Sequence, residues 1–276
     1  MKNLCILTLF LLLFIEGKAQ FFVPNKALVQ MLEDKPLLVI ATPDALGELT
    51  KKFALQLWKA NPSVTCLSPR ETDRKLDREA GKYAVLSWYF TQRTSPFAGV
   101  FESKEVFVLG LQLHGEGTDD FVTVHEIAFP DSVLAAYDVA FALQQLQIDL
   151  EAGANKMYAE DKAFWNRGEI NTYIQQYQLF LPDEKQVLFE LFFPESQQAA
   201  CKFVKTADIL QTMQAHDSTT FFVTQVFSDT HFEPIFVLVS SANWEPVLFL
   251  TFTPMTYLAD NGSIVPLPQS PYNSEY

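Results

Sequence analysis

Residues 35–90 alternate between short apolar runs and stretches in which apolar residues recur three or four positions apart. Three runs predict buried strands, Pro36–Ala41, Val64–Leu67 and Tyr83–Phe90. The first intervening stretch carries a helical apolar stripe and opens at Thr42-Pro43, which we expect to cap it. The second opens with the capping-box pattern of Ser68 and Glu71 and ends at Gly81. The order is strand, helix, strand, helix, strand.

A hairpin and two helices are expected to follow this unit. Residues 105–114 and 120–129 read as its strands, on either side of a Gly-rich turn. Residues 91–103 before them read as a surface loop. One long helix is predicted from Asp131 to about Glu151, where Gly153 ends it, and a second over residues 156–178.

The order of elements in the first unit returns from Lys185 onwards. Gln186–Phe193 corresponds to the first strand, and only Glu195–Ala200 stands where the first helix was. The later matches are Lys202–Val204, Thr219–Phe227, Glu233–Ser240 and Glu245–Thr253. The pattern predicts an α/β protein of two Rossmann-like lobes with mixed sheets, a pseudo-repeat joined by long helices. The alternative is that any α/β chain repeats strands at such intervals.

The N-terminus has the pattern of a secretory signal peptide. Lys2 precedes the apolar run Leu4–Ile15, and Gly17-Lys18-Ala19 supplies small residues before a predicted cut after Ala19. A bilayer span needs about 20 apolar residues, so the run favours a cleaved signal over the alternative of a membrane anchor. The predicted location is periplasmic or secreted, with no stable membrane insertion after cleavage. The predicted parts are 1–19 signal peptide, 20–130 first lobe, 131–180 connecting helices, 181–258 second lobe with one helix missing, and 259–276 flexible tail.

The formal net charge of −13 narrows the classes of partner. Nucleic acids and anionic lipids select clustered Lys and Arg, whereas the densest basic cluster, Arg70–Lys82, is interleaved with acids. Nucleic acid is therefore not an expected partner, and a small molecule or a protein is. After signal cleavage only Cys66 and Cys201 remain, at equivalent places in the two units, and whether they are oxidised stays open.

Motifs that would identify a reaction are absent from the sequence. The turn Thr42–Gly47 lacks the glycines of a dinucleotide- or phosphate-binding loop. Neither Gly-x-Ser-x-Gly nor His-Glu-x-x-His nor Cys-x-x-Cys occurs. We therefore predict no catalytic residue, no cofactor and no metal, although catalytic groups can still converge from distant loops.

Two places remain as candidate binding sites. The hairpin tip gathers imidazole and carboxylate groups, the kinds of ligand that divalent metals use, at His114, Glu116, Asp119 and Asp120. If the turn centres near Gly117, His125 pairs near Leu109 or Gly110, about 15 Å from His114 at the rise of a strand. Such residues are also ordinary turn formers.

Trp244 is the second candidate, because it lies in the turn Ser241–Trp244, where an exposed Trp would mark a binding surface. The alternative is that a Trp at a strand end belongs to the core.

The signal ending in Ala-Gln, the pattern Trp58-x-x-Asn61 and the strand Lys82-Tyr83-Ala84-Val85-Leu86 resemble those of uncharacterised exported proteins of Bacteroidetes-type bacteria. The resemblance covers roughly Pro36–Trp88 and, more weakly, Lys202–Phe227. It implies a periplasmic or secreted location and brings no activity with it.

Three functional hypotheses follow. The first is a non-catalytic protein that holds a ligand or partner between its lobes. The second is a hydrolase-type enzyme that uses scattered carboxylates with His114 or His125. An exposed His beside an acid would favour it. The third is a structural subunit of a cell-envelope assembly, which a large exposed Phe-rich face would favour.

Overall fold

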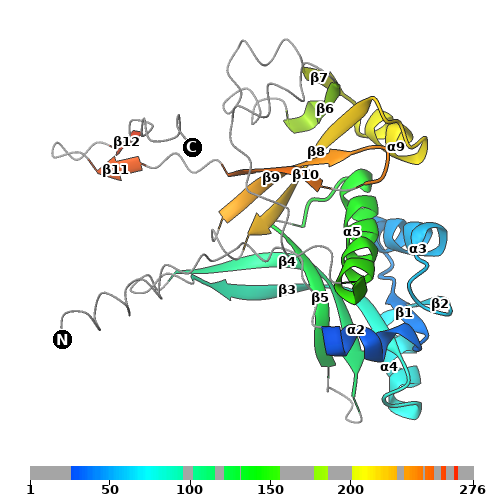
Figure 1. The fold of residues 1–276 in the computed structure, drawn as a ribbon. Coiled ribbons are helices and arrows are strands. Elements are labelled where there is room, and N and C mark those ends of the chain that lie inside the picture. Colours follow the sequence, from blue (N-terminus) through cyan, green and yellow to red (C-terminus); the bar gives the residue numbers. More distant parts are fainter. Residues whose placement is uncertain are drawn as a thin grey trace, which may run out of the picture.

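The computed structural model describes residues 26–95, 102–115, 121–130, 132–155, 177–185, 201–228, 233–244, 246–251, 256–258 and 264–266. Within them the fold is mixed α/β, with two five-stranded mixed sheets (Figure 1). None of the helices in these ranges is long and apolar enough to cross a membrane.

The first sheet has the order β2-β1-β3-β4-β5. Its strands are β1 (Leu37–Ile40), β2 (Val64–Leu67), β3 (Ala84–Thr94), β4 (Ser103–His114) and β5 (Phe121–Phe129). β1 pairs in parallel with β2 and β3, whereas β3–β4 and β4–β5 are antiparallel. The expected unit and hairpin are therefore one sheet. β3 runs on to Thr94 in register with β4, so the expectation of a surface loop from residue 91 is wrong for Thr91–Thr94.

Within the described residues, four helices lie against this sheet: α2 (Lys26–Glu33), α3 (Ala45–Leu57), α4 (Pro69–Arg78) and α5 (Ala136–Asn155). Leu37 and Val39 point to the inner face of the sheet, in the main core with α2, α3 and α5. Leu38 points to the outer face and packs with Leu76 of α4 in a separate small cluster. The continuous apolar run of β1 is thus explained by burial on both faces.

The second sheet has the order β7-β6-β8-β9-β10. Its strands are β6 (Gln178–Pro182), β7 (Cys201–Val204), β8 (Thr220–Ser228), β9 (Glu233–Ser240) and β10 (Pro246–Thr251). β6 is parallel to β7 and β8, while β8–β9 and β9–β10 are antiparallel. Helix α9 (Thr206–Gln214) follows β7, and the 3₁₀ turn η1 (Asp183–Lys185) follows β6.

The place of the first strand in this second sheet is held by Gln178–Pro182. The prediction of a helix to about Gln178 is therefore wrong at its end, because Gln178 is the first residue of β6, in which Leu179 and Leu181 point inward. Gln186–Phe193 and Glu195–Ala200, which we matched to the first strand and helix, lie outside the described residues.

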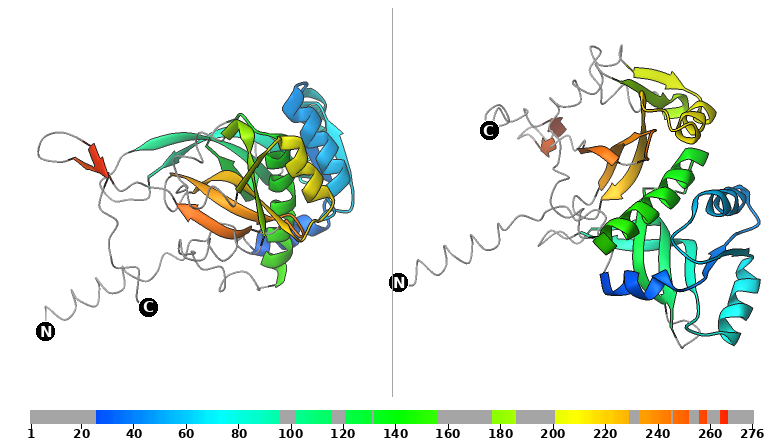
Figure 2. Two further views of the ribbon diagram at one scale, coloured as in Figure 1. Left: turned by 90° about the horizontal axis from the view of Figure 1, so that it is seen from above. Right: turned by 45° about the vertical axis from the view of Figure 1, so that its right-hand side comes forward.

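Helix α5 lies between the two sheets (Figures 1 and 2). Its residues between Tyr137 and Leu150 are buried almost all round, so it carries no simple amphipathic pattern. It begins at Ala136, later than expected, and continues through Gly153. Packing from several elements stabilises such a helix, and one interior Gly costs only about 1 kcal/mol.

One continuous core joins the two halves through α5. It contains side chains of the first sheet, of α9, and of β8 and β9. Tyr137 packs edge-on against Phe222, with ring centroids 5.9 Å apart. Asp138 accepts a 2.6 Å hydrogen bond from the Thr224 hydroxyl. The halves are therefore fastened together by apolar and polar contacts.

Two short strands, β11 (Thr256–Leu258) and β12 (Ile264–Pro266), form a separate antiparallel pair. β12 lies in the range that the sequence predicts to be a flexible tail, so that part of the tail forms a strand.

Candidate functional site

The structure gives no support to His114 as a metal ligand. His114 is 3% exposed, and its Nδ1 accepts a hydrogen bond from the Gly81 backbone N–H at 3.3 Å. A neutral ring that accepts at Nδ1 carries its proton on Nε2, which then has no lone pair for a metal. Among the described residues Nε2 also has no hydrogen-bond partner. Glu116, Asp119 and Asp120 lie outside the described residues, and no group of three or more His, Cys, Asp or Glu within them could hold a metal.

Trp244 lies in the core. Its side chain is 3% exposed, and its Nε1 donates to the Met213 carbonyl oxygen at 3.1 Å. This placement gives no support to a surface-binding role. Trp244 and His216 are the two described non-Gly residues with positive φ, 65° and 51°.

His216 stands where a helix commonly ends on Gly. The N–H groups of His216 and Asp217 bond the carbonyls of Met213 and Thr212, which is the Schellman pattern at the end of α9. Its Nδ1 bonds the Ala242 carbonyl oxygen at 2.8 Å. The left-handed backbone therefore has a structural explanation.

His125 points into the core because of a β-bulge. It lies opposite Leu111 and not opposite Leu109 or Gly110 as predicted, because Val124 is an extra residue in β5. Its Nε2 lies 2.9 Å from Asp149 Oδ2 of α5, and Gln145 donates to the other carboxylate oxygen. The side chains of the pair are 8% and 1% exposed. This His–Asp pair is a buried link between β5 and α5, out of reach of substrate.

The turn after β1 is filled by the protein itself. Asp44, and not Thr42, is the N-cap of α3: its carboxylate accepts from Gly47 N–H at 2.7 Å and from the Thr42 hydroxyl at 2.9 Å. These hydrogen bonds hold the pKa of Asp44 below its usual range. A side chain at position 47 would lie 2.0 Å from the Thr42 carbonyl oxygen. The helix N-terminus is capped by a carboxylate, at the place where a nucleotide phosphate would bind.

The pattern Trp58-x-x-Asn61 is structural. Trp58 Nε1 donates to Asn61 Oδ1 at 2.8 Å. The Asn61 amide donates to the carbonyls of Leu32 and Lys35 at 3.0 and 2.8 Å. The pair ties the end of α3 to the turn between α2 and β1. The capping box of Ser68 and Glu71 is likewise present, as predicted.

Cys66 and Cys201 are not joined in a disulfide and lie on the edge strands β2 and β7 of different sheets. Burial raises the pKa of Cys66, and it raises the pKa of Cys201 to about 11. Neither thiol has the lowered pKa of a nucleophile.

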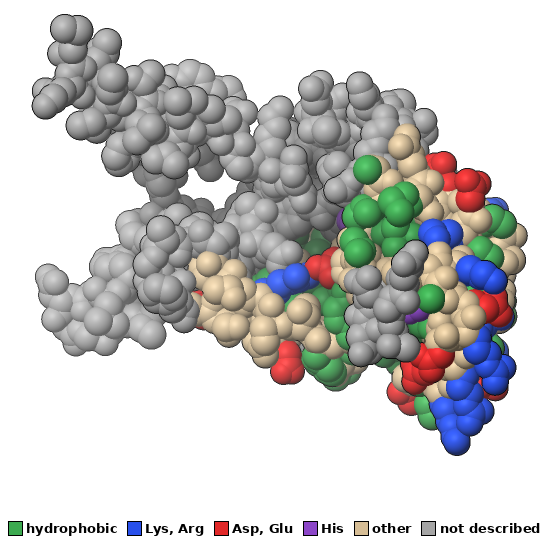
Figure 3. Space-filling model, turned by 90° about the horizontal axis from the view of Figure 1, so that it is seen from below, with side chains coloured by type: hydrophobic (Ala, Val, Ile, Leu, Met, Phe, Trp, Pro, Cys, Tyr) green, Lys and Arg blue, Asp and Glu red, His purple; other side chains and the backbone are tan. Residues whose placement is uncertain are grey.

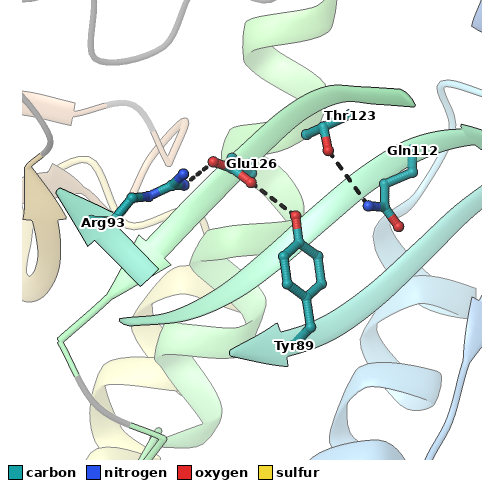
Figure 4. A network of polar contacts seen from close by, with 5 residues as sticks. All are labelled: Tyr89, Arg93, Gln112, Thr123 and Glu126. Carbon is teal, nitrogen blue, oxygen red and sulfur yellow. Dashed lines mark hydrogen bonds and ion pairs between the residues drawn. The ribbon is translucent and has the colours of Figure 1, made fainter. Parts of the chain in front are cut away.

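A polar cluster lies on the outer face of the first sheet (Figure 4). The Tyr89 hydroxyl donates to Glu126 Oε2 at 2.8 Å, and Arg93 forms an ion pair with Glu126 Oε1. The Arg93 and Glu126 side chains are 22% and 24% exposed. Beside them the Gln112 amide donates to the Thr123 hydroxyl at 3.4 Å. We call these five residues the Tyr89–Glu126 cluster.

Position 110 must be Gly to hold the cluster in place. A Cβ there would lie 2.5 Å from Tyr89 Cε1 and 2.6 Å from its hydroxyl oxygen. The Tyr89 ring therefore lies across β4 and brings its hydroxyl over to β5. Burial raises the pKa of Tyr89, while the Thr123 hydroxyl and the charge of Arg93 act in the opposite direction.

The Tyr89–Glu126 cluster adjoins the junction of the two halves. Tyr89 packs against a small apolar cluster of Val106, Val108 and Ala128 from the first sheet and Phe227 from β8. The second half thus reaches the outer face of the first sheet beside the polar groups. This brings together side chains that are 138 positions apart, from Tyr89 to Phe227.

This cluster is not among the sites predicted from the sequence, although the sequence contains two signals for it. Tyr89 and Arg93 are four apart in a strand and so share a face. Gly110 interrupts an apolar strand, which often marks a close approach of another group. Which face of the sheet carries Glu126 depends on the β-bulge at Val124.

In the space-filling view, basic and acidic side chains lie interspersed over the right-hand part of the face, and only small areas of His surface are seen (Figure 3). No model of a protein family matches the chain, and neither a curated protein nor a solved structure does.

Proposed function

We propose that this protein is exported by a cleaved signal peptide and binds a ligand or partner, without chemical conversion, at the junction of two related lobes. The Tyr89–Glu126 cluster carries the proposal. It is a charged group, about a quarter exposed, held on a β-sheet beside the point where Phe227 of the other half packs. Binding sites combine a few fixed polar groups with apolar surroundings in this way.

The proposal that the lobes are a Rossmann-like pseudo-repeat rests on the sheets. β1–β5 and β6–β10 have the same order and the same parallel and antiparallel pairings. Cys66 and Cys201 fall on equivalent strands, β2 and β7.

A cleft that opens by a hinge between the lobes is less favoured. The core through α5 and the Asp138–Thr224 hydrogen bond would have to separate. We therefore propose binding to a largely preformed surface.

The hydrolase hypothesis is weaker, because each described histidine is either buried or hydrogen-bonded to the backbone. His114 and His125 are buried, and the exposed His216 bonds a backbone carbonyl. His231 lies outside the described residues.

The envelope-subunit hypothesis needs a Phe-rich surface. Among the described Phe side chains only Phe90 and Phe121 are exposed. They lie opposite Phe107 and His114 of β4, respectively, and so are not neighbours on one face.

The test compares the mature wild-type chain with Glu126→Gln in thermal-shift and native-mass measurements against a periplasmic extract. We expect a mass adduct and a raised melting temperature for the wild type, both lost in the variant. Glu102→Gln removes an equal charge from the exposed Glu102–Lys104 pair and serves as the control. A wild-type chain that gains neither mass nor stability would refute the proposal, as would an adduct that persists in Glu126→Gln.

For export, N-terminal mass spectrometry should find Gln20 as the first residue. A retained Met1 would refute that part.

A further inference from the structure

We infer that the paired strands β3 and β4 bind a neutral oligosaccharide on their inner face, at Phe90, Gln92 and Glu105. The site is separate from the one in the proposed function, because successive residues of a strand point to opposite faces and Phe90 therefore lies on the face that Tyr89 does not. Burial along this face ends near Trp88, whose Nε1 donates to the Thr50 hydroxyl of α3 at 2.9 Å. Beyond Trp88, Phe90 and Gln92 are exposed.

A row of aromatic rings leads out of the sheet and ends at Phe90. Trp88 and Phe107 are stacked, with ring centroids 5.0 Å apart and an interplanar angle of 10°. Phe107, which is 7% exposed, meets the Phe90 ring at 4.8 Å with a tilt of 45°. Phe90 is 57% exposed, the most exposed of the described Phe residues. Its ring is therefore held in place by Phe107 and is still open to a ligand.

Gln92 and Glu105 supply hydrogen-bonding groups beside this ring. They lie directly opposite each other, two positions along the strands from the Phe90–Phe107 pair and so on the same face. The Ser103 hydroxyl donates to Gln92 Oε1 at 2.9 Å, which leaves the two hydrogens of Nε2 as donors. Within the described part of the chain, neither Gln92 Nε2 nor the exposed Glu105 carboxylate has a partner. The face therefore offers an apolar ring, unused donors and an unused acceptor together.

This combination favours a sugar over other ligands. A sugar ring has an apolar C–H face to lie on Phe90, and hydroxyls at its edge that both donate to Glu105 and accept from Gln92. An apolar chain would cover these polar groups without pairing them, which costs free energy. An acidic sugar would be repelled by Glu105 and by the net charge of −13. A basic group would pair with Glu105 and leave the Gln92 donors unused.

The experiment titrates the mature chain with three neutral tetrasaccharides, cellotetraose, maltotetraose and chitotetraose, and follows binding by calorimetry. For an open site with one aromatic ring, we expect a dissociation constant on the order of millimolar for at least one of them. Sorbitol, which has hydroxyls but no ring, and the acidic tetragalacturonate should not bind.

Variants then assign the binding to this face. Phe90→Ala should weaken it about tenfold, whereas Phe90→Trp, which keeps an aromatic face, should retain or strengthen it. Gln92→Ala should weaken binding about threefold to tenfold. Phe121→Ala removes the other exposed Phe and is the matched control, which should bind as the wild type does. Circular dichroism shows whether each variant keeps the fold.

Several results would overturn the inference. These are equal binding of sorbitol, preferential binding of tetragalacturonate, or a tetrasaccharide affinity that is unchanged in Phe90→Ala. Failure of all three tetrasaccharides to bind would overturn it too, and a dimer that Phe90→Ala dissociates in sedimentation would then assign the face to a second copy of the chain. Glu126→Gln should leave tetrasaccharide binding unchanged, so this test and that of the proposed function succeed or fail separately.

Discussion

The two halves of the molecule share strand order and pairing. Yet α5 lies on opposite faces of the two equivalent sheets. In the first half, α4 follows the second strand and lies on the outer face, away from α5. In the second half, α9 follows the corresponding strand and packs directly on α5. Equivalent helices thus have opposite environments (Figure 2).

The difference follows from the amino-acid composition of the two helices. α4 is rich in charges and buries Thr72 and Leu76. α9 carries a single acid in its first turn and buries Ile209 and Met213. An identical connection therefore places a helix on a given side of a sheet, and the apolar content of that helix decides whether the side faces solvent or a second layer.

The largest expected effect breaks the α9–α5 packing. Ile209 is fully buried, so Ile209→Ala should lower the free energy of unfolding by about 2–5 kcal/mol. Because the core is shared, urea unfolding followed by Trp fluorescence and by circular dichroism should remain one coincident transition. Leu76→Ala in α4 is the matched change and should cost less. Two separate transitions would show that the halves unfold independently.

The polar contact between the halves comes next. Thr224→Val removes the hydroxyl that donates to the 1% exposed carboxylate of Asp138. We expect a loss of about 1.5–3 kcal/mol, because a hydrogen bond to a charged group is removed. Thr220→Val, whose hydroxyl makes a longer 3.5 Å bond to a backbone carbonyl, is the control. Equal losses in the two variants would contradict a special role for the Asp138 contact. The measurement is denaturant unfolding.

Gly110→Ala tests the outer face of the first half. The new Cβ would displace the Tyr89 ring and break its bond to Glu126, at a cost of about 1–3 kcal/mol. In a Tyr89→Ser background the same change should cost much less, since the ring is gone. A double-mutant cycle in chemical denaturation measures this coupling. Additive effects would mean that Tyr89 does not depend on Gly110.

The smallest effect is pH-dependent. Asp44→Ala should cost about 1 kcal/mol at neutral pH through loss of the α3 cap. The pKa of Asp44 is lowered by folding, so its contribution is present above the ordinary value near 3.8 and is lost as the pH falls through the lowered value. Thermal unfolding between pH 2 and 7 should show the gap between wild type and Asp44→Ala closing at the acid end. Glu48→Ala, in the same first turn, is the control, and a gap that stays constant would contradict the assignment.

Local patterns predicted much of the fold. β2 and β9 have the predicted bounds, and the capping box of Ser68 and Glu71 is confirmed. These features depend on residues within a few positions of one another. The first strand of the second half was misplaced. The short segment Gln178–Pro182 follows a predicted helix and becomes a strand through its pairing with β7 and β8.

The candidate site shows the same division. Its residues other than Arg93 all lie in predicted strands, but the single extra residue Val124 reverses the inward and outward alternation of side chains along β5. It sends His125 inward to Asp149 and leaves Glu126 outward beside Tyr89. A one-residue shift of register exchanges the two faces of a strand. The pattern of residues in β5 alone does not predict this shift.

The sequence by itself determined the α/β class, most strands and the helix start at Ser68, because hydrophobic period and capping are local. Only the tertiary structure decided that α5 joins both sheets, that α9 turns toward it while α4 turns away, and that Phe227 adjoins Tyr89. Those contacts join residues far apart in the chain. They form where the burial of apolar surface, summed over several elements, is greatest.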